Sequence, residues 1–194
     1  MQRLKIAING FGRIGRAFFR IAFSDPNIEI VGINDLAPKD VLTHLLKYDS
    51  VHHKNQHSIA INPDGFSIND IPVRCIQEAD IEKLPWKEWG VDLVIEASGK
   101  NLSKECAEKH LNAGAHKVII TAPSTSEDVK FIVLGVNDHI LSSSDRIISN
   151  ASCTTNNAAP MIKVLHDNFG VQRCFITTVH SFTRDQNLHD GPHK

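Results

Sequence analysis

The sequence predicts an α/β fold in which a doubly wound, mostly parallel sheet is followed by the start of an α+β domain. Three observations support this prediction. Short β-branched runs alternate with helix-period segments through the first 150 residues, the first run leads directly into a glycine-rich turn, and another helical pattern with a β-like run behind it follows position 150. We therefore expect a first domain over residues 1–150 and the beginning of a second over residues 151–194.

The first 35 residues carry a pattern typical of dinucleotide-binding proteins. An apolar strand over residues 4–9 leads into the G-x-G-x-x-G of residues 10–15, a helix is expected over 16–24, and a second strand over 28–33 precedes Asp35. The glycines allow a tight turn, close approach of a pyrophosphate and packing of helix on strand. The helix start faces the phosphates, and the acid accepts hydrogen bonds from a ribose diol. Residues 1–150 are therefore interpreted as a dinucleotide-binding domain of the Rossmann type.

A glycine turn selected only for close packing is the alternative interpretation of this motif. On the helix that follows, an apolar face is expected from Ile14, Ala17, Phe18, Ile21 and Ala22. The candidate cofactor-binding residues of this unit are Asn9, Gly10, Phe11, Gly12, Arg13, Ile14, Gly15 and Asp35.

The rest of the first domain continues the alternation of helix and strand patterns. A helix is expected over 38–48, and the Asn-Pro-Asp-Gly at 62–65 predicts a hairpin that departs from the parallel arrangement and is followed by a strand over 71–76. Further expected elements are strands over 92–97, 117–121 and 131–136 and a helix over 103–113. We place the domain boundary near residues 148–151.

The stretch 150–156, Asn-Ala-Ser-Cys-Thr-Thr-Asn, sets one cysteine just ahead of a helical pattern that ends at Gly170. A helix start carries free N–H groups and a partial positive charge, and both favour a thiolate. The same N–H groups can hold the oxyanion that forms when Cys153 attacks a carbonyl. The sequence therefore predicts a nucleophilic cysteine, with a small buried residue beside a helix cap as the alternative.

These motifs together resemble the phosphorylating glyceraldehyde-3-phosphate dehydrogenases over essentially the whole chain. The resemblance rests on residues 8–16, 45–50, 149–156, 177–181 and 190–194. It implies the N-terminal portion of a glycolytic enzyme that oxidises glyceraldehyde 3-phosphate with NAD and inorganic phosphate to 1,3-bisphosphoglycerate.

The resemblance also implies the chemistry. Cys153 adds to the aldehyde carbon, and His180, on a β-like run over 173–182, accepts the proton and assists hydride departure. The thioester left on Cys153 is then attacked by phosphate to give an acyl phosphate. A satisfied core histidine is the alternative for His180.

Further site residues follow from the same resemblance. Ser152, Thr154 and Thr183 correspond to positions that hold the substrate phosphate or the attacking phosphate, although each such residue taken alone is more often a cap or turn residue. Ser98, Gly99 and Thr121 correspond to strand ends that line the cofactor cleft. Because Asp35 would repel a 2′-phosphate, NAD is favoured over NADP.

Three features depart from the family pattern. Asn157 stands where the family commonly has a second cysteine, and Arg184 stands where many bacterial members have asparagine. Family chains run well beyond position 194, and the remainder would carry further phosphate-binding groups and most of the interface of an expected homotetramer. Two alternatives remain open: the related erythrose-4-phosphate dehydrogenase, and a non-catalytic NAD-binding fragment.

Composition narrows the range of partners. The chain has a net charge of −1, with both signs interspersed, so neither nucleic acid nor a membrane is an expected partner. Its four cysteines show no paired or zinc-type spacing, which favours a reducing cytoplasm. The eleven histidines form no ligand-like spacing, so no metal site is expected. No signal peptide and no membrane-length apolar run are expected either.

Overall fold

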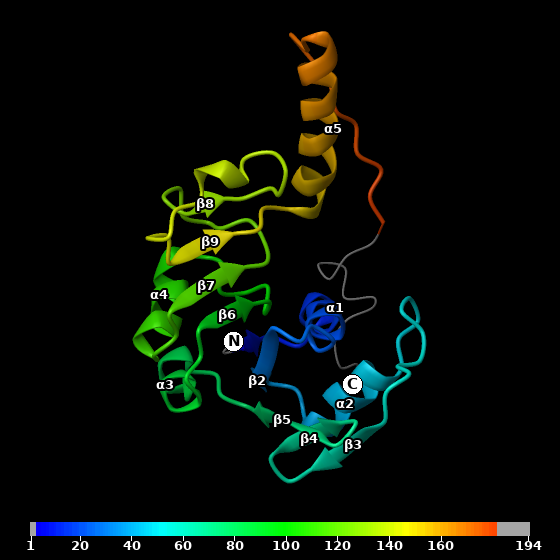
Figure 1. Cartoon of the computed structure of the whole chain (residues 1–194), viewed down its shortest axis with the longest axis vertical. Helices are drawn as coiled ribbons and strands as arrows, with labels where there is room; N and C mark the ends of the chain where they lie inside the picture. Colours follow the sequence, from blue (N-terminus) through cyan, green and yellow to red (C-terminus); the bar gives the residue numbers. More distant parts are fainter. Residues whose placement is uncertain (1–2, 182–194) are drawn as a thin grey trace.

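Nine strands form a single sheet within residues 3–181, the part of the chain that the computed structural model describes. Their order across the sheet is β3-β4-β5-β2-β1-β6-β7-β9-β8 (Figure 1). The strands are β1 Leu4–Asn9, β2 Ile28–Asn34, β3 Ile59–Asn62, β4 Gly65–Ile68, β5 Ile71–Ile76, β6 Leu93–Glu96, β7 Lys117–Ile120, β8 Lys130–Phe131 and β9 Ile147–Ser149.

The central strands have the order of a doubly wound fold. From β5 through β2, β1, β6 and β7 to β9, every neighbouring pair is parallel, and the strand order reverses between β1 and β6. Strands β3 and β4 form an antiparallel hairpin that joins the edge of β5. The predicted fold class is therefore confirmed, including the antiparallel excursion.

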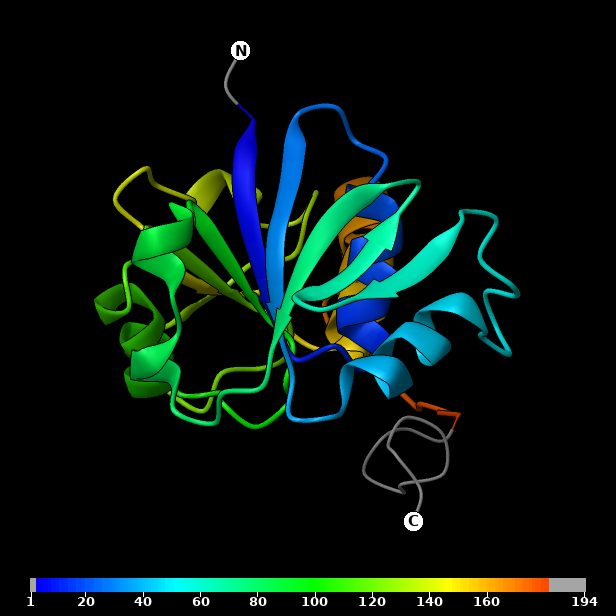
Figure 2. The ribbon, with the colours of Figure 1, turned by 90° about the horizontal axis from the view of Figure 1, so that it is seen from below.

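Helices cover both faces of the sheet. Figure 2 shows α1 and α2 on one face and α3 and α4 on the other. The helices are α1 Arg13–Ala22, α2 Lys39–Lys47, α3 Trp86–Trp89, α4 Lys104–Asn112 and α5 Cys153–Phe169, with short 3₁₀ turns at Ile81–Lys83 and Asp138–Ile140. Helix α4 begins at the cap residue Ser103, whose hydroxyl accepts a hydrogen bond from the N–H of Cys106.

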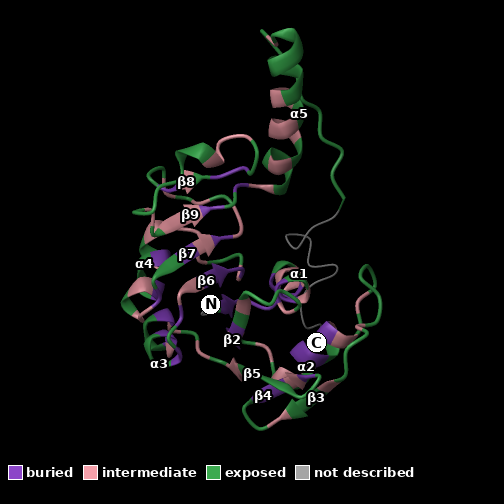
Figure 3. Cartoon of the chain, in the orientation of Figure 1, coloured by how far each residue is buried: buried purple, intermediate pink, exposed green. Residues whose placement is uncertain are grey.

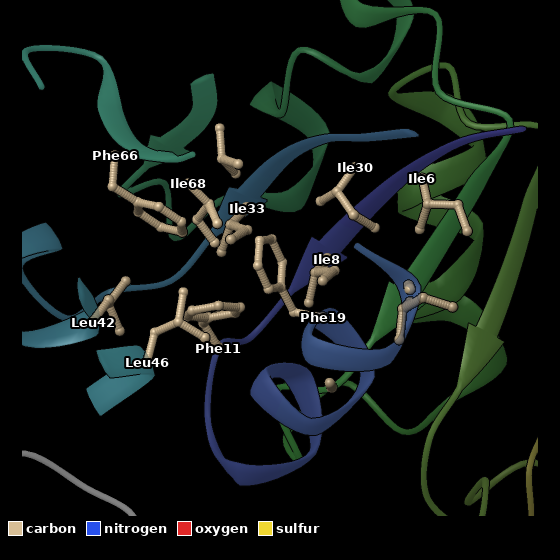
Figure 4. Close-up of a cluster of buried hydrophobic side chains, with 14 residues drawn as sticks. Ile6, Ile8, Phe11, Phe19, Ile30, Ile33, Leu42, Leu46, Phe66 and Ile68 are labelled. Carbon is tan, nitrogen blue, oxygen red and sulfur yellow. The ribbon is translucent and has the colours of Figure 1, made fainter. Parts of the chain in front are cut away.

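Two clusters of buried apolar side chains lie on the opposite faces. The cluster under α1 and α2 is built around three aromatic rings, of Phe11, Phe19 and Phe66, which lie in mutual contact (Figure 4). The other cluster lies under α3 and α4 and contains Trp86 and Trp89. Burying a large apolar side chain contributes about 1.5–3 kcal/mol, so these clusters dominate the stability of the domain.

The buried face of α1 agrees only in part with the one expected, since Ala22 is buried and Phe18 packs against the core as predicted. Its buried apolar positions are Gly15, Phe19 and Ala22, at a spacing of four and three, whereas Ile21 is 78% exposed and Ile14 is also exposed. The cause is local: Gly15 must pack against Ile8 and the Gly10 carbonyl, and this contact fixes the rotation of the helix. The helix also begins at Arg13, three residues earlier than expected.

The prediction of a strand over residues 131–136 is wrong for every residue except the first. Strand β8 ends at Phe131, and the chain then turns, with Leu134 81% exposed. The side chain of Asn137 accepts a hydrogen bond from the N–H of Val133 and donates one to the carbonyl of Phe131, which folds the segment into a turn. Sequence reasoning instead missed β9, a strand of three residues beside the predicted domain boundary.

Helix α5 extends from the sheet and contains no buried residue (Figure 3). It ends, as predicted, at Gly170, which adopts the left-handed conformation of a C-cap. Residues 171–181 then return along the helix toward its start without strand structure. The β-like run expected over 173–182 is therefore wrong for its described residues, because no strand among residues 3–181 lies beside it to supply backbone partners.

Candidate functional site

A cavity of about 230 Å³ lies at the carboxyl ends of β1, β2 and β6, where the strand order reverses. Open α/β sheets bind their ligands at this switch point. Six of the predicted cofactor-binding residues line the cavity: Asn9, Gly10, Phe11, Gly12, Asp35 and Ser98. Residues that sequence reasoning did not place in the cofactor site also line it, among them Arg16, Asn34, Glu78, Lys100 and Asn101.

The three glycines of the motif have different surroundings. Gly10 has a φ of 92°, and a Cβ added to it would lie 2.6 Å from the Ala97 carbonyl carbon and closer still to the backbone of Ser98. A Cβ on Gly15 would overlap the carbonyl oxygen of Gly10. A Cβ on Gly12 would meet no atom within 4 Å, so the space above this residue is open. This is the cradle that a pyrophosphate needs at the start of α1.

Asp35 is held in place by the glycine-rich turn itself. Its carboxylate accepts hydrogen bonds from the N–H of Phe11 at 2.6 Å and from the N–H of Ala37 at 2.9 Å. A carboxylate has about four acceptor positions, so two remain for ribose hydroxyls. These residues therefore fit a dinucleotide with a free ribose diol.

The other predicted cofactor residues lie near the cavity without lining it. Gly99 has a positive φ in the turn after β6, and the hydroxyl of Thr121 donates to the carbonyl of Glu96 at 3.0 Å. Arg13 and Ile14 form the first turn of α1. Their direct contact with a cofactor stays a prediction.

Cys153 is the first residue of α5, and the chain is bent sharply to place it there. Ala151 has a φ of 55°, an unfavourable conformation for a residue with a side chain. Its N–H donates to the hydroxyl of Ser149, which fixes the bend. The hydroxyl of Ser152 then caps the helix by accepting the N–H of Thr155 at 3.0 Å. Cys153 is consequently exposed at the positive end of a 17-residue helix.

The structure brings Cys153 and His180 together, 27 positions apart in the sequence. Their Sγ and Nε2 atoms are 3.3 Å apart, and the other ring nitrogen of His180 donates to the carbonyl of Ser181 at 2.6 Å. The hydrogen bond from His180 holds the pKa of the Cys153 thiol below its ordinary value. The Ser181 carbonyl and then Cys153 raise the pKa of His180. The pairing favours the thiolate form of Cys153 and so activates it as a nucleophile.

The structure describes two of the three predicted phosphate-binding residues. Ser152 and Thr154 stand at the start of α5 with their hydroxyl oxygens 2.9 Å apart, and the Ser152 hydroxyl also serves as the helix cap. Thr183 lies outside the described residues, as does Arg184. A role of Ser152 and Thr154 in binding phosphate stays a prediction.

Replacing His180 by asparagine is expected to raise the pKa of Cys153. The substitution removes the main interaction that lowers the thiol pKa, so alkylation of Cys153 by iodoacetamide should reach half its maximal rate at a higher pH. Below that pH, Cys153 of the variant should be alkylated more slowly than Cys153 of the wild-type protein. The pH profile of labelling, read at Cys153 by peptide mass spectrometry, checks this. An unchanged profile would contradict the pairing, and Cys174, exposed and on the same segment as His180, is the internal control.

The cavity, the glycine-rich turn and the acid at the end of β2 define a dinucleotide-binding α/β protein. Comparison with known families is more specific. Residues 4–104 match the model described as glyceraldehyde 3-phosphate dehydrogenase, NAD binding domain, and residues 152–194 match the model of the C-terminal domain of the same enzyme. The chain therefore belongs to the glyceraldehyde 3-phosphate dehydrogenase family, and the resemblance seen in the sequence is confirmed.

Curated relatives agree along nearly the whole chain. Glyceraldehyde-3-phosphate dehydrogenases of Geobacillus stearothermophilus and Thermotoga maritima are each 50% identical over 192 residues, and that of Mycoplasma pneumoniae is 47% identical over 192 residues. These alignments cover 98–99% of this chain and 57% of each relative. The chain thus spans somewhat more than half the length of the relatives it matches.

Between residues 3 and 181, no three potential ligand side chains are grouped so as to hold a metal ion. No helix in this range is long and apolar enough to cross a membrane.

Proposed function

We propose that this chain is the N-terminal portion of a phosphorylating glyceraldehyde-3-phosphate dehydrogenase that uses NAD. The observation that carries the proposal is the 3.3 Å contact between Cys153 Sγ and His180 Nε2 at the start of α5. A nucleophile–base pair of this kind, in a chain that also has a dinucleotide cleft, supports aldehyde oxidation by covalent catalysis. The family models and the relatives support the same enzyme.

The geometry supports the following steps. The Cys153 thiolate adds to the aldehyde carbon, and the N–H groups at the start of α5 stabilise the oxyanion. His180, which holds the thiol proton, donates it to the oxyanion to give the hemithioacetal hydroxyl and accepts it back as the carbonyl re-forms. NAD, when bound, supplies the hydride acceptor that turns the hemithioacetal into a thioester. Inorganic phosphate then attacks the thioester carbon, and the C–S bond breaks to release an acyl phosphate and return the thiolate.

NAD is proposed over NADP because of Asp35. Its carboxylate, oriented by the N–H groups of Phe11 and Ala37, suits a ribose diol and would repel a 2′-phosphate. Asn9, Gly10, Gly12 and Ser98 are proposed to hold the rest of the dinucleotide, because they line the same cavity.

We also propose that the complete protein is a cytoplasmic homotetramer that acts on small molecules only. The four cysteines are all unpaired, which suits a reducing compartment. Apolar side chains of α5 such as Val164 and Phe169 are exposed in the described chain and suit burial in a larger assembly. The intact mass of the purified protein, compared with the 21.5 kDa of these residues, together with its mass in solution, tests this.

The activity is tested with the complete gene product by following NADH absorbance with each aldehyde, with and without phosphate. We expect NADH to form with glyceraldehyde 3-phosphate at a rate that depends on phosphate. NADH formation with erythrose 4-phosphate alone would instead identify the related dehydrogenase. NAD binding without turnover of either aldehyde would indicate a non-catalytic binding module.

A further inference from the structure

A row of buried polar side chains crosses the sheet beneath the cofactor cavity. Asn34, Asn9 and Glu96 are the last residues of β2, β1 and β6, and they are direct register partners. All three side chains are buried, with Glu96 only 1% exposed. Apolar residues precede each of them in its strand, so the row lies where the core ends and the cavity begins.

Hydrogen bonds join the members of this row. The amide of Asn34 donates to the side-chain oxygen of Asn9 at 2.7 Å, and the amide of Asn9 donates to Glu96 Oε2 at 2.6 Å. The Asn34 oxygen accepts the N–H of Glu78 at 2.9 Å. Three strands and the loop after β5 are therefore connected through side chains as well as through the backbone ladder.

The row continues away from the cavity into α4 and α3. His110 Nε2 lies 3.0 Å from Glu96 Oε2, and His110 Nδ1 lies 2.9 Å from the indole nitrogen of Trp86. An indole can only donate, so Nδ1 must accept. Nε2 then carries the ring proton and donates it to Glu96, which assigns the neutral tautomer to His110. Glu96 is thus a buried carboxylate held by neutral donors.

The second oxygen of Glu96 holds the opposite wall of the cavity. Glu96 Oε1 accepts the N–H of Ser98 at 2.8 Å, and the neighbouring N–H of Ala97 donates to the carbonyl of Asn9 at 2.7 Å. Ser98 is also the residue whose backbone lies directly against Gly10. One carboxylate therefore fixes Asn9 on one side of the switch point and Ser98 on the other.

We propose that Glu96 is a positioning residue for the dinucleotide. It acts through Asn9 and through the backbone of Ser98, and it sets the width of the cavity between the turn of Gly10 and the loop after β6. His110 and Trp86 hold the carboxylate in one orientation. The proposal rests on the proposed binding of NAD, and it assigns a role in binding to a side chain that does not itself line the cavity.

A purely electrostatic role for Glu96 would have the opposite sign. A negative charge beneath the cavity repels the pyrophosphate, so removing the charge alone would tighten NAD binding. Loss of positioning would weaken it, because the two walls would no longer be held at a fixed separation. The direction of the change in NAD affinity therefore separates the two roles.

Glu96→Gln tests the proposal, because glutamine has the same shape but only one acceptor oxygen. If that oxygen faces Asn9 and His110, the new NH2 group faces the N–H of Ser98. Two hydrogen-bond donors then face each other with no acceptor between them. We expect the dissociation constant for NAD, measured calorimetrically with the complete protein, to rise about tenfold. Amide hydrogen exchange at Ser98 in the cofactor-free protein should become faster.

Val118→Ala is the matched control. Val118 is buried in β7 and does not line the cavity, so it should lower thermal stability without changing NAD affinity. Equal or tighter NAD binding by Glu96→Gln would overturn the proposal, as would an equal loss of affinity in Val118→Ala. Failure of the wild-type protein to bind NAD would instead overturn the proposed function.

A measurement on the unaltered protein covers the case in which Glu96→Gln does not fold. The indole N–H of Trp86 is at the far end of the chain of hydrogen bonds that reaches Ser98, whereas no such bond joins Trp89 to the row. Saturation with NAD should therefore shift the indole ¹⁵N–¹H resonance of Trp86 more than that of Trp89. A Trp86 resonance that does not move would contradict the proposal.

Discussion

Cys153→Ser is expected to lower the rate of NADH formation by at least about 1000-fold, because a serine hydroxyl at this site is neither a thiolate nor able to form the thioester. The 3.3 Å contact with His180 lowers the pKa of the thiol, and it cannot ionise a hydroxyl to a comparable extent. NAD affinity should change by less than about twofold, because Cys153 does not line the cofactor cavity. Steady-state rates and calorimetric titration of the complete protein give the two values.

Cys174→Ser is the matched control for this experiment. Cys174 is also exposed and lies beside α5 in the groove that contains Cys153 and His180, but it has no imidazole partner among the described residues. The Cys174→Ser variant should retain nearly all the activity in NADH formation, and labelling of its Cys153 should be unchanged. Comparable loss of activity in both variants would show that the groove needs small thiol side chains for packing, and the assignment of Cys153 as the nucleophile would then be withdrawn.

The first βαβ unit could be predicted from the sequence because its requirements are local. A strand, a glycine turn and an acid at a fixed spacing each follow from short-range geometry, and β1, β2 and Asp35 are found where the pattern indicated them, with α1 between them. The start and end of α5 were equally predictable, because Ser152 and Gly170 are strong cap residues. Local signals of this kind do not depend on the rest of the fold.

Features that depend on tertiary contacts were not predictable in the same way. The contact of Gly15 with Gly10 sets the rotation of α1 about its axis. The face of the helix that carries the most apolar residues does not set it. The turn after Phe131 depends on the side chain of Asn137, which the apolar run of residues 131–136 obscures. The run at 173–182 has β propensity, but strand structure also needs a neighbouring strand.

The buried polar row carries a signal that could have been found. The parallel strands β1, β2 and β6 each end in a polar residue directly after an apolar run, at Asn9, Asn34 and Glu96. Since the carboxyl ends of parallel neighbours meet at one edge, these side chains must either be exposed or bond to each other. Their mutual register, which decides between the two, is a property of the sheet and not of any one strand.

Gly10→Ala is expected to lower the free energy of unfolding by about 3 kcal/mol or more. Two costs combine: a φ of 92° is unfavourable for alanine, and the new Cβ would overlap the backbone of Ala97 and Ser98. The backbone cannot move aside without breaking the bond from Ser98 to Glu96. Urea unfolding of the cofactor-free protein measures the loss, and NAD affinity should fall as well because Ser98 forms the opposite wall of the cavity.

Gly12→Ala, in the same turn, separates the effect of a glycine on stability from its effect on NAD binding. Gly12 has a φ of −70° and free space around its missing side chain, so alanine there should leave the unfolding free energy within about 0.5 kcal/mol of the wild-type value. The added methyl group would nevertheless occupy the cradle proposed for the pyrophosphate, and NAD affinity should fall about tenfold or more. Gly10→Ala should therefore lose stability and binding together, whereas Gly12→Ala should lose binding alone. Undiminished NAD binding by Gly12→Ala would place the pyrophosphate elsewhere in the molecule.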